Sequence, residues 1–147
     1  MSHTTRVSEV RVHNVAALER AVASLNAEAG TKITMKRDAD CRLWGSAKER
    51  CDVVLTVEGC RFDVGFQKAK DGIGLVPIFD AHGHELYQHL GQGREQAKTT
   101  EEYSLCHVGR LMQAYAREAI YHEALMQGAS VTMHTNPTGQ LVMMVMQ

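Results

Sequence analysis

The chain has 147 residues, of which 44% are hydrophobic and 22% charged, and its formal net charge is −1. This length and balance predict a single domain over residues 1–147, and they exclude disordered and membrane-spanning classes. The N-terminal residues carry no signal or transit pattern, so we expect a cytoplasmic protein. The four cysteines lack the paired C-x-x-C spacing of zinc and redox sites, so we expect reduced thiols.

Local patterns predict the elements of the first half of the chain. Alternating apolar residues indicate a strand within Thr5–Val12, and Asn14 is placed to cap a helix that ends near Gly30. A short strand is expected at Lys32–Lys36. The segment Arg37–Arg50 has no clear period and is predicted to be a loop or a short irregular helix.

The next two segments flank the dipeptide Glu58-Gly59, which predicts a tight hairpin between Asp52–Val57 and Cys60–Gln67. That turn would place Val57 opposite Cys60, Leu55 opposite Phe62 and Val53 opposite Val64. Phe62 and Phe66 are therefore expected to point into the core.

Four further elements are expected towards the C-terminus. An edge strand is predicted at Ile73–Phe79, because Gly74 and Pro77 interrupt it, and a long helix is predicted from Thr100 to Gln127. A hairpin is predicted from Ser130–Thr135 and Gln140–Met146. The sum predicts an α+β protein with a mainly antiparallel sheet of about six to seven strands and two helices packed on one face.

Several strings resemble an uncharacterised family of small proteins encoded in chloroplast, cyanobacterial and tailed-phage genomes. They are the opening MSHTT and four strings beginning at Val15, Arg61, Leu111 and Gly139, which read VAAL, RFDVG, LMQAYA and GQLV. The chain differs in having Thr138 where the family has Asp, and in a longer, His-rich segment at 80–98. The resemblance implies a fold and a phage or plastid setting, with host cytoplasm as the location for a phage protein. It implies no catalytic residue.

The segment from Lys32 to Lys70 holds nine of the sixteen Lys and Arg residues, together with Trp44. Cations beside an aromatic ring are what single-stranded nucleic acid requires, for phosphates and for stacked bases. Six acidic residues in the range 31–70 leave an excess of only +3, and Asp38, Asp40 and Glu49 would repel a phosphate backbone. The residues expected to bind nucleic acid are Lys36, Arg37, Arg42, Trp44, Lys48, Arg50, Arg61, Lys68 and Lys70.

Two other functions remain open at this point. The first is a protein-interaction module that captures a host, phage or polymerase component through an exposed strand or the methionines Met143, Met144 and Met146. The second is a small metal-dependent enzyme using Asp80 and the histidines between His82 and His89, although their spacing matches no metal motif. Cys106 and His107 are adjacent on a helix and so point apart, which argues against a catalytic pair. We expect a non-enzymatic homo-oligomer without cofactor, metal or membrane partner.

Overall fold

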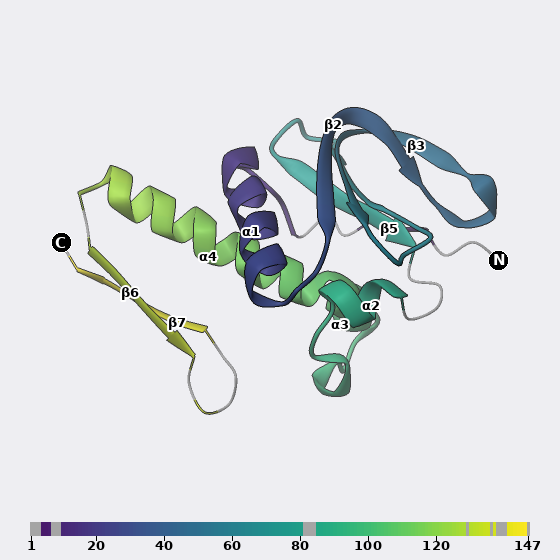
Figure 1. Cartoon of the computed structure of the whole chain (residues 1–147). Coiled ribbons are helices and arrows are strands. Elements are labelled where there is room, and N and C mark those ends of the chain that lie inside the picture. The colour runs from purple at the N-terminus through teal and green to yellow at the C-terminus, as the bar shows by residue number, and fades with distance from the viewer. Residues whose placement is uncertain are drawn as a thin grey trace.

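The computed structural model describes residues 4–6, 10–80, 85–128, 130–135, 137 and 141–146. Five strands form one antiparallel sheet in the order β1, β5, β4, β3, β2, and β6 and β7 form a separate two-stranded sheet (Figure 1). The strands are β1 (Thr4–Arg6), β2 (Ile33–Arg42), β3 (Lys48–Val57), β4 (Val64–Lys68), β5 (Leu75–Asp80), β6 (Ser130–Thr135) and β7 (Leu141–Met146). The helices are α1 (Val15–Glu28), α2 (Glu85–Leu90), α3 (Thr100–Leu105) and α4 (Gly109–Met126), with 3₁₀ turns η1 (Trp44–Ser46), η2 (Arg94–Gln96) and η3 (Cys106–Val108).

The α+β class is confirmed, but one sheet of six to seven strands is not supported. The C-terminal hairpin does not join the main sheet in the described part of the chain. The expected pair of helices is also wrong, because the helix predicted from Thr100 is interrupted at η3 and α2 forms within the His-rich segment.

Helices α1 and α4 cover one face of the main sheet (Figure 1). The apolar residues of α1 recur every three or four positions, so Leu18, Val22 and Leu25 reach one buried stripe. Asn14 caps α1 as predicted, with its side chain accepting a hydrogen bond from the amide of Ala17. The hydroxyl of Tyr115 in α4 accepts hydrogen bonds from two further amides just before α1, so the two helices are tied together.

Strands β2 and β3 form one long hairpin, so the loop predicted at Arg37–Arg50 is wrong. Their pairing runs from Ile33 opposite Val57 to Arg42 opposite Lys48. At Asp38 the backbone takes a left-handed conformation (φ 51°), and beyond it the hairpin folds across the second face of the sheet. Cys41, Leu43 and Cys51 pack there, together with Val54 and Ile78. This change of face hides the alternation that would identify a strand.

The β3–β4 register differs from the prediction by two residues. Leu55 lies opposite Val64 and Val53 opposite Phe66, because the connection extends from Glu58 to Asp63 beyond the predicted turn. A shift of two keeps every side chain on its face, since strand side chains alternate with period two. Phe66 in β4 is accordingly buried, and Phe62, which lies in the connection before β4, is buried as well, so both predictions are confirmed.

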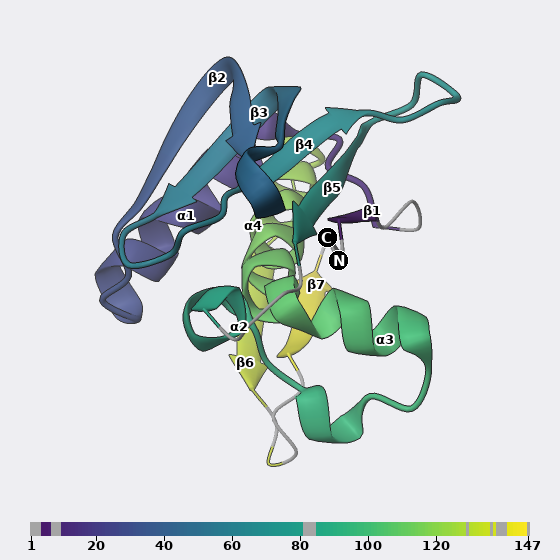
Figure 2. The ribbon, with the colours of Figure 1, turned by 90° about the vertical axis from the view of Figure 1, so that its right-hand side faces the viewer.

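Strand β5 lies between β4 and β1 (Figure 2), so its expected place at an edge is wrong. Pro77, which has no amide hydrogen to donate, lies just past the residues that pair with β1. The predicted N-terminal strand is divided in two, with β1 at Thr4–Arg6 and an isolated bridge from Val12 to Leu75.

The C-terminal part of α4 extends beyond the main sheet, and the β6–β7 hairpin follows it (Figure 1). The two strands confirm the hairpin predicted at this end, while most of its turn lies outside the described residues. No helix in the described ranges is long and apolar enough to cross a membrane.

Candidate functional site

Arg42, predicted to bind phosphate, is held by a buried carboxylate. Its guanidinium donates to Asp63 at 2.9 Å from Nη2 and 3.1 Å from Nε, and its backbone amide donates to the same group at 2.9 Å. Asp63 is only 2% exposed. The hydrogen bonds from Arg42 to Asp63 raise the pKa of the guanidinium further. Arg42 therefore links the end of β2 to the connection that leads into β4 through hydrogen bonds to Asp63.

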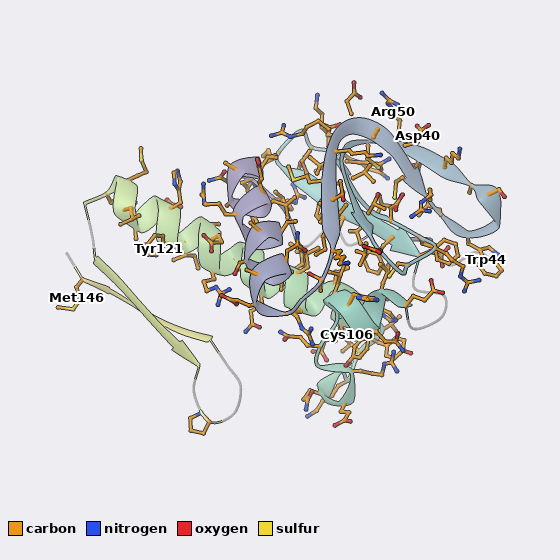
Figure 3. The ribbon with its side chains drawn as sticks, in the orientation of Figure 1. Asp40, Trp44, Arg50, Cys106, Tyr121 and Met146 are labelled. Atoms are coloured by element: carbon orange, nitrogen blue, oxygen red, sulfur yellow. The ribbon has the colours of Figure 1, made fainter. Side chains whose placement is uncertain are left out.

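Trp44 is anchored rather than presented on a mobile loop. Its ring lies 5.9 Å from the ring of Phe62, at an interplanar angle of 58°, and its backbone amide donates to Asp80 at 3.2 Å. These two contacts fix Trp44, at the end of the β2–β3 hairpin, against the buried residues Phe62 and Asp80. The side chain lies at the end of the molecule formed by the β2–β3 hairpin (Figure 3).

Arg50 and Arg61 also have acidic partners. Arg50 lies 3.3 Å from Asp38 and 3.6 Å from Asp40. Figure 3 shows Arg50 beside Asp40 on the bent hairpin. Arg61 forms an ion pair of 2.9 Å with Glu85, which starts α2. The hydrogen bond from the backbone amide of Arg61 is the main reason that the pKa of Glu85 lies below its ordinary value.

The five other predicted cations, Lys36, Arg37, Lys48, Lys68 and Lys70, are exposed and form no ion pair with another described residue. The structure brings two of them together. Lys68 and Lys70 line a cavity of about 560 Å³ with Arg11, which the sequence analysis did not select. Arg11 itself donates to Asp71 at 2.7 Å and thereby lowers the pKa of that carboxyl group. Of the nine predicted residues, Lys68 and Lys70 are those that line this cavity.

The cysteines are free and buried. Burial raises the pKa of Cys60 to about 11 and that of Cys41 still further, so both thiols stay protonated at neutral pH. Cys106 lies 3.9 Å from Nδ1 of His107, but its thiol donates to the carbonyl of Tyr103 at 2.9 Å. Nδ1 of His107 also lies 3.0 Å from that carbonyl oxygen, which can only accept a hydrogen bond, so Nδ1 is the donor in this contact.

The histidine segment is only partly described. His82 and His84 lie outside the described residues, while His89 is on α2 with its ring beside Gly59. Within the described ranges, no three His, Cys, Asp or Glu side chains are grouped so as to hold a metal ion.

The sequence analysis missed an exposed apolar surface on α4. Ile120 fits the apolar spacing of this helix, but it is 46% exposed, and Leu125 and Met126 are 50% and 76% exposed. The helix simply extends past the sheet that would have covered them. Tyr121 of α4 and Met146 of β7 lie at the end of the molecule away from Trp44 (Figure 3). We call residues Ala119–Met126 together with β6 and β7 the C-terminal arm.

A groove of about 510 Å³ runs along the base of this arm. It is lined by apolar residues of α4, Tyr115, Ala119, Ile120 and Met126, and also by charged and polar residues, among them Glu123 and His122 of α4 and Arg11 and His13, which precede α1. The groove joins the exposed apolar surface to the body of the protein.

No protein-family model, curated protein or solved structure matches the chain.

Proposed function

We propose that the protein is a non-enzymatic protein-interaction module that binds a partner through its C-terminal arm. The observation that supports this proposal is the exposure of Ile120, Leu125 and Met126 on a helix that has passed the end of its own sheet. Single exposed apolar residues are normal, whereas several on one projecting element mark an interaction surface.

The hairpin that follows α4 supports the same role. A two-stranded hairpin alone in water is marginally stable, and strands gain stability by adding a third strand or packing against a helix. Eight of the twelve residues of β6 and β7 are apolar, including all six of β7. Binding to a partner would supply the apolar contacts that such a hairpin requires.

The test compares two variants that change exposed apolar residues. Leu125→Glu combined with Met126→Glu places charges in the arm, and Ile73→Glu places one on a residue that is 60% exposed in the β4–β5 turn. Because all three side chains are exposed, each variant should keep the stability of the natural protein to within about 0.5 kcal/mol. Complexes formed by the protein in nuclease-treated host extract should be lost with the arm variant alone. Loss with both variants, or with neither, would contradict the proposal.

Nucleic-acid binding, with single strands preferred, is a second candidate because Lys68 and Lys70 line one cavity, beside the ion pair of Arg11 and Asp71. We propose phosphates as the ligands of these cations. A labelled oligonucleotide titrated at low and raised salt should bind with a negative salt dependence, and Lys68→Ala combined with Lys70→Ala should reduce the slope by about 0.7 per lost contact on a single strand. Lys98→Ala, which removes an equally exposed lysine before α3, is the control. Binding without a salt slope would rule this candidate out.

A further inference from the structure

We infer that the partner of the C-terminal arm is a second copy of this chain, and that two β7 strands pair antiparallel across a two-fold axis. This inference rests on the proposed protein-binding role of the arm. It names the occupant, which the proposed function leaves open.

The surface area of the chain is the first argument. A compact monomer of 16.3 kDa is expected to expose about 7,500 Å². This chain exposes 8601 Å², an excess of about 1,100 Å² over that expectation. If two copies each covered that excess, about 2,200 Å² would be buried, which is within the range of obligate homodimers. The excess therefore matches the area that a stable dimer needs.

The charge of the arm is the second argument. Between Ala119 and Gln147 the sequence contains no Lys, Arg or Asp and a single Glu, Glu123, although 22% of the whole chain is charged. Obligate homodimer interfaces are more apolar than transient ones, and their cores are depleted of charge. The formal net charge of −1 also produces little repulsion between two copies. A nucleic acid or a strongly charged protein would find little complementary charge on the arm, where Glu123 is the one charged residue of this range.

The open edge of β7 is the third argument. Proteins usually protect an edge strand with a lysine, a proline or a bulge. The six residues of β7 include no lysine and no proline. Strand β7 pairs only with β6 in the described part of the chain, so one of its edges remains open. A two-fold axis perpendicular to a sheet turns a strand into its own antiparallel neighbour, so identical β7 strands are complementary without any further adjustment. The product is one four-stranded sheet with β6 at each outer edge.

The groove at the base of the arm would accept part of the second copy. Its wall is apolar at Ala119, Ile120 and Met126, which continue the exposed surface, and it carries the opposite charges of Arg11 and Glu123. Side chains from the partner's arm that entered the groove would extend the contact from the strands to α4.

The first measurement is the mass of the purified full chain by light scattering across a wide range of concentrations. We expect twice 16.3 kDa for the natural protein and for Ile73→Glu, and the mass of one chain for the Leu125→Glu, Met126→Glu variant. A single-chain mass for the natural protein at every concentration would overturn the inference. A mass that grows without limit would also overturn it, because closed two-fold pairing stops at two copies. So would a dimer that the arm variant leaves intact.

The second measurement is amide hydrogen exchange of β7. In a free hairpin every second amide of β7 points away from β6 and exchanges rapidly, whereas in the paired dimer consecutive amides from Leu141 to Met146 are protected. Alternating protection in the purified protein would overturn the inference. If the β7 amides of the labelled protein then became fully protected in host extract, the arm would bind a different protein, and the proposed function would stand without the dimer. If these amides stayed alternately protected in the extract, the dimer inference and the proposed function would both fail.

Discussion

The pair of Arg42 and Asp63 leads to the sharpest stability prediction. The sequence suggested that Arg42 binds phosphate, but its guanidinium compensates a carboxylate that is 2% exposed. We therefore expect Arg42→Ala to destabilise the fold itself. The backbone amide of residue 42 would still donate to Asp63, so the variant removes only the side-chain hydrogen bonds.

The expected loss follows from the exposure of the two partners. Removing one member of a fully buried ion pair costs about 3–5 kcal/mol, because the other charge stays buried without compensation. The side chain of Arg42 is 47% exposed, so water screens the pair and replaces part of the lost hydrogen bonding. We expect a loss of about 2–3 kcal/mol in the free energy of unfolding. For a domain of this size the melting temperature should fall by about 5–10 °C.

Urea unfolding measures this loss, and the fluorescence of Trp44, the single tryptophan, reports on the same end of the hairpin. Lys48→Ala is the matched control, because Lys48 lies opposite Arg42 and has no ion pair with another described residue. The control should change stability by less than about 0.5 kcal/mol. If Arg42→Ala unfolds at the same urea concentration as Lys48→Ala, Asp63 does not depend on Arg42 and the reasoning is refuted.

Three further variants test other contacts of the fold. Gly65→Ala would place a Cβ 2.5 Å from Sγ of Cys51, so we expect a loss of about 1–3 kcal/mol by urea unfolding, partly recovered when Cys51→Ala is added. Tyr115→Phe removes the hydroxyl that accepts two amides before α1, at 2.8 and 3.2 Å, and should cost about 1–3 kcal/mol in thermal unfolding. The folded pKa of Glu85 lies below its ordinary value of 4.5, so the hydrogen bond that it accepts from the backbone amide of Arg61, together with the ion pair to the Arg61 side chain, adds stability above that pH and loses it as the pH falls through the folded pKa. Urea midpoints of Glu85→Gln and the natural protein should therefore differ at neutral pH and converge well below pH 4.5; an unchanged difference would exclude this linkage.

Elements whose signals are local were predictable from the sequence. Helix α1 is an example, since the cap at Asn14 and the spacing of Leu18 and Leu25 are both contained in the element itself. The outer half of the β2–β3 hairpin was not predictable, because its bend depends on positive φ angles at Asp38 and Ser46, which are not glycines. The residues that it buries also face a different side of the sheet from those before the bend.

The candidate site illustrates a second limit of sequence reasoning. Charges between Lys32 and Lys70 were counted as a block because they are close along the chain. Their actual partners come from other elements, such as Asp63 for Arg42 and Glu85 for Arg61, and the count cannot reveal these pairs. The part of the arm formed by α4 was missed for the opposite reason. Ile120 fits the helical stripe of α4, and only the extent of the sheet shows that the helix runs past it and leaves this side chain 46% exposed.

Helix α4 is continuous from the main core to the C-terminal arm. Its first half places Leu111, Met112 and Tyr115 in the main core, and its second half forms the base of the arm without a break. A partner that binds only the folded arm stabilises it by mass action, and the last turns of a continuous helix fray less when their end is held. The amides of the last two turns of α4 should therefore exchange more slowly when the arm is occupied, while those beside Tyr115 keep their protection. The contrast between the two halves of one helix separates binding at the arm from a general gain in stability.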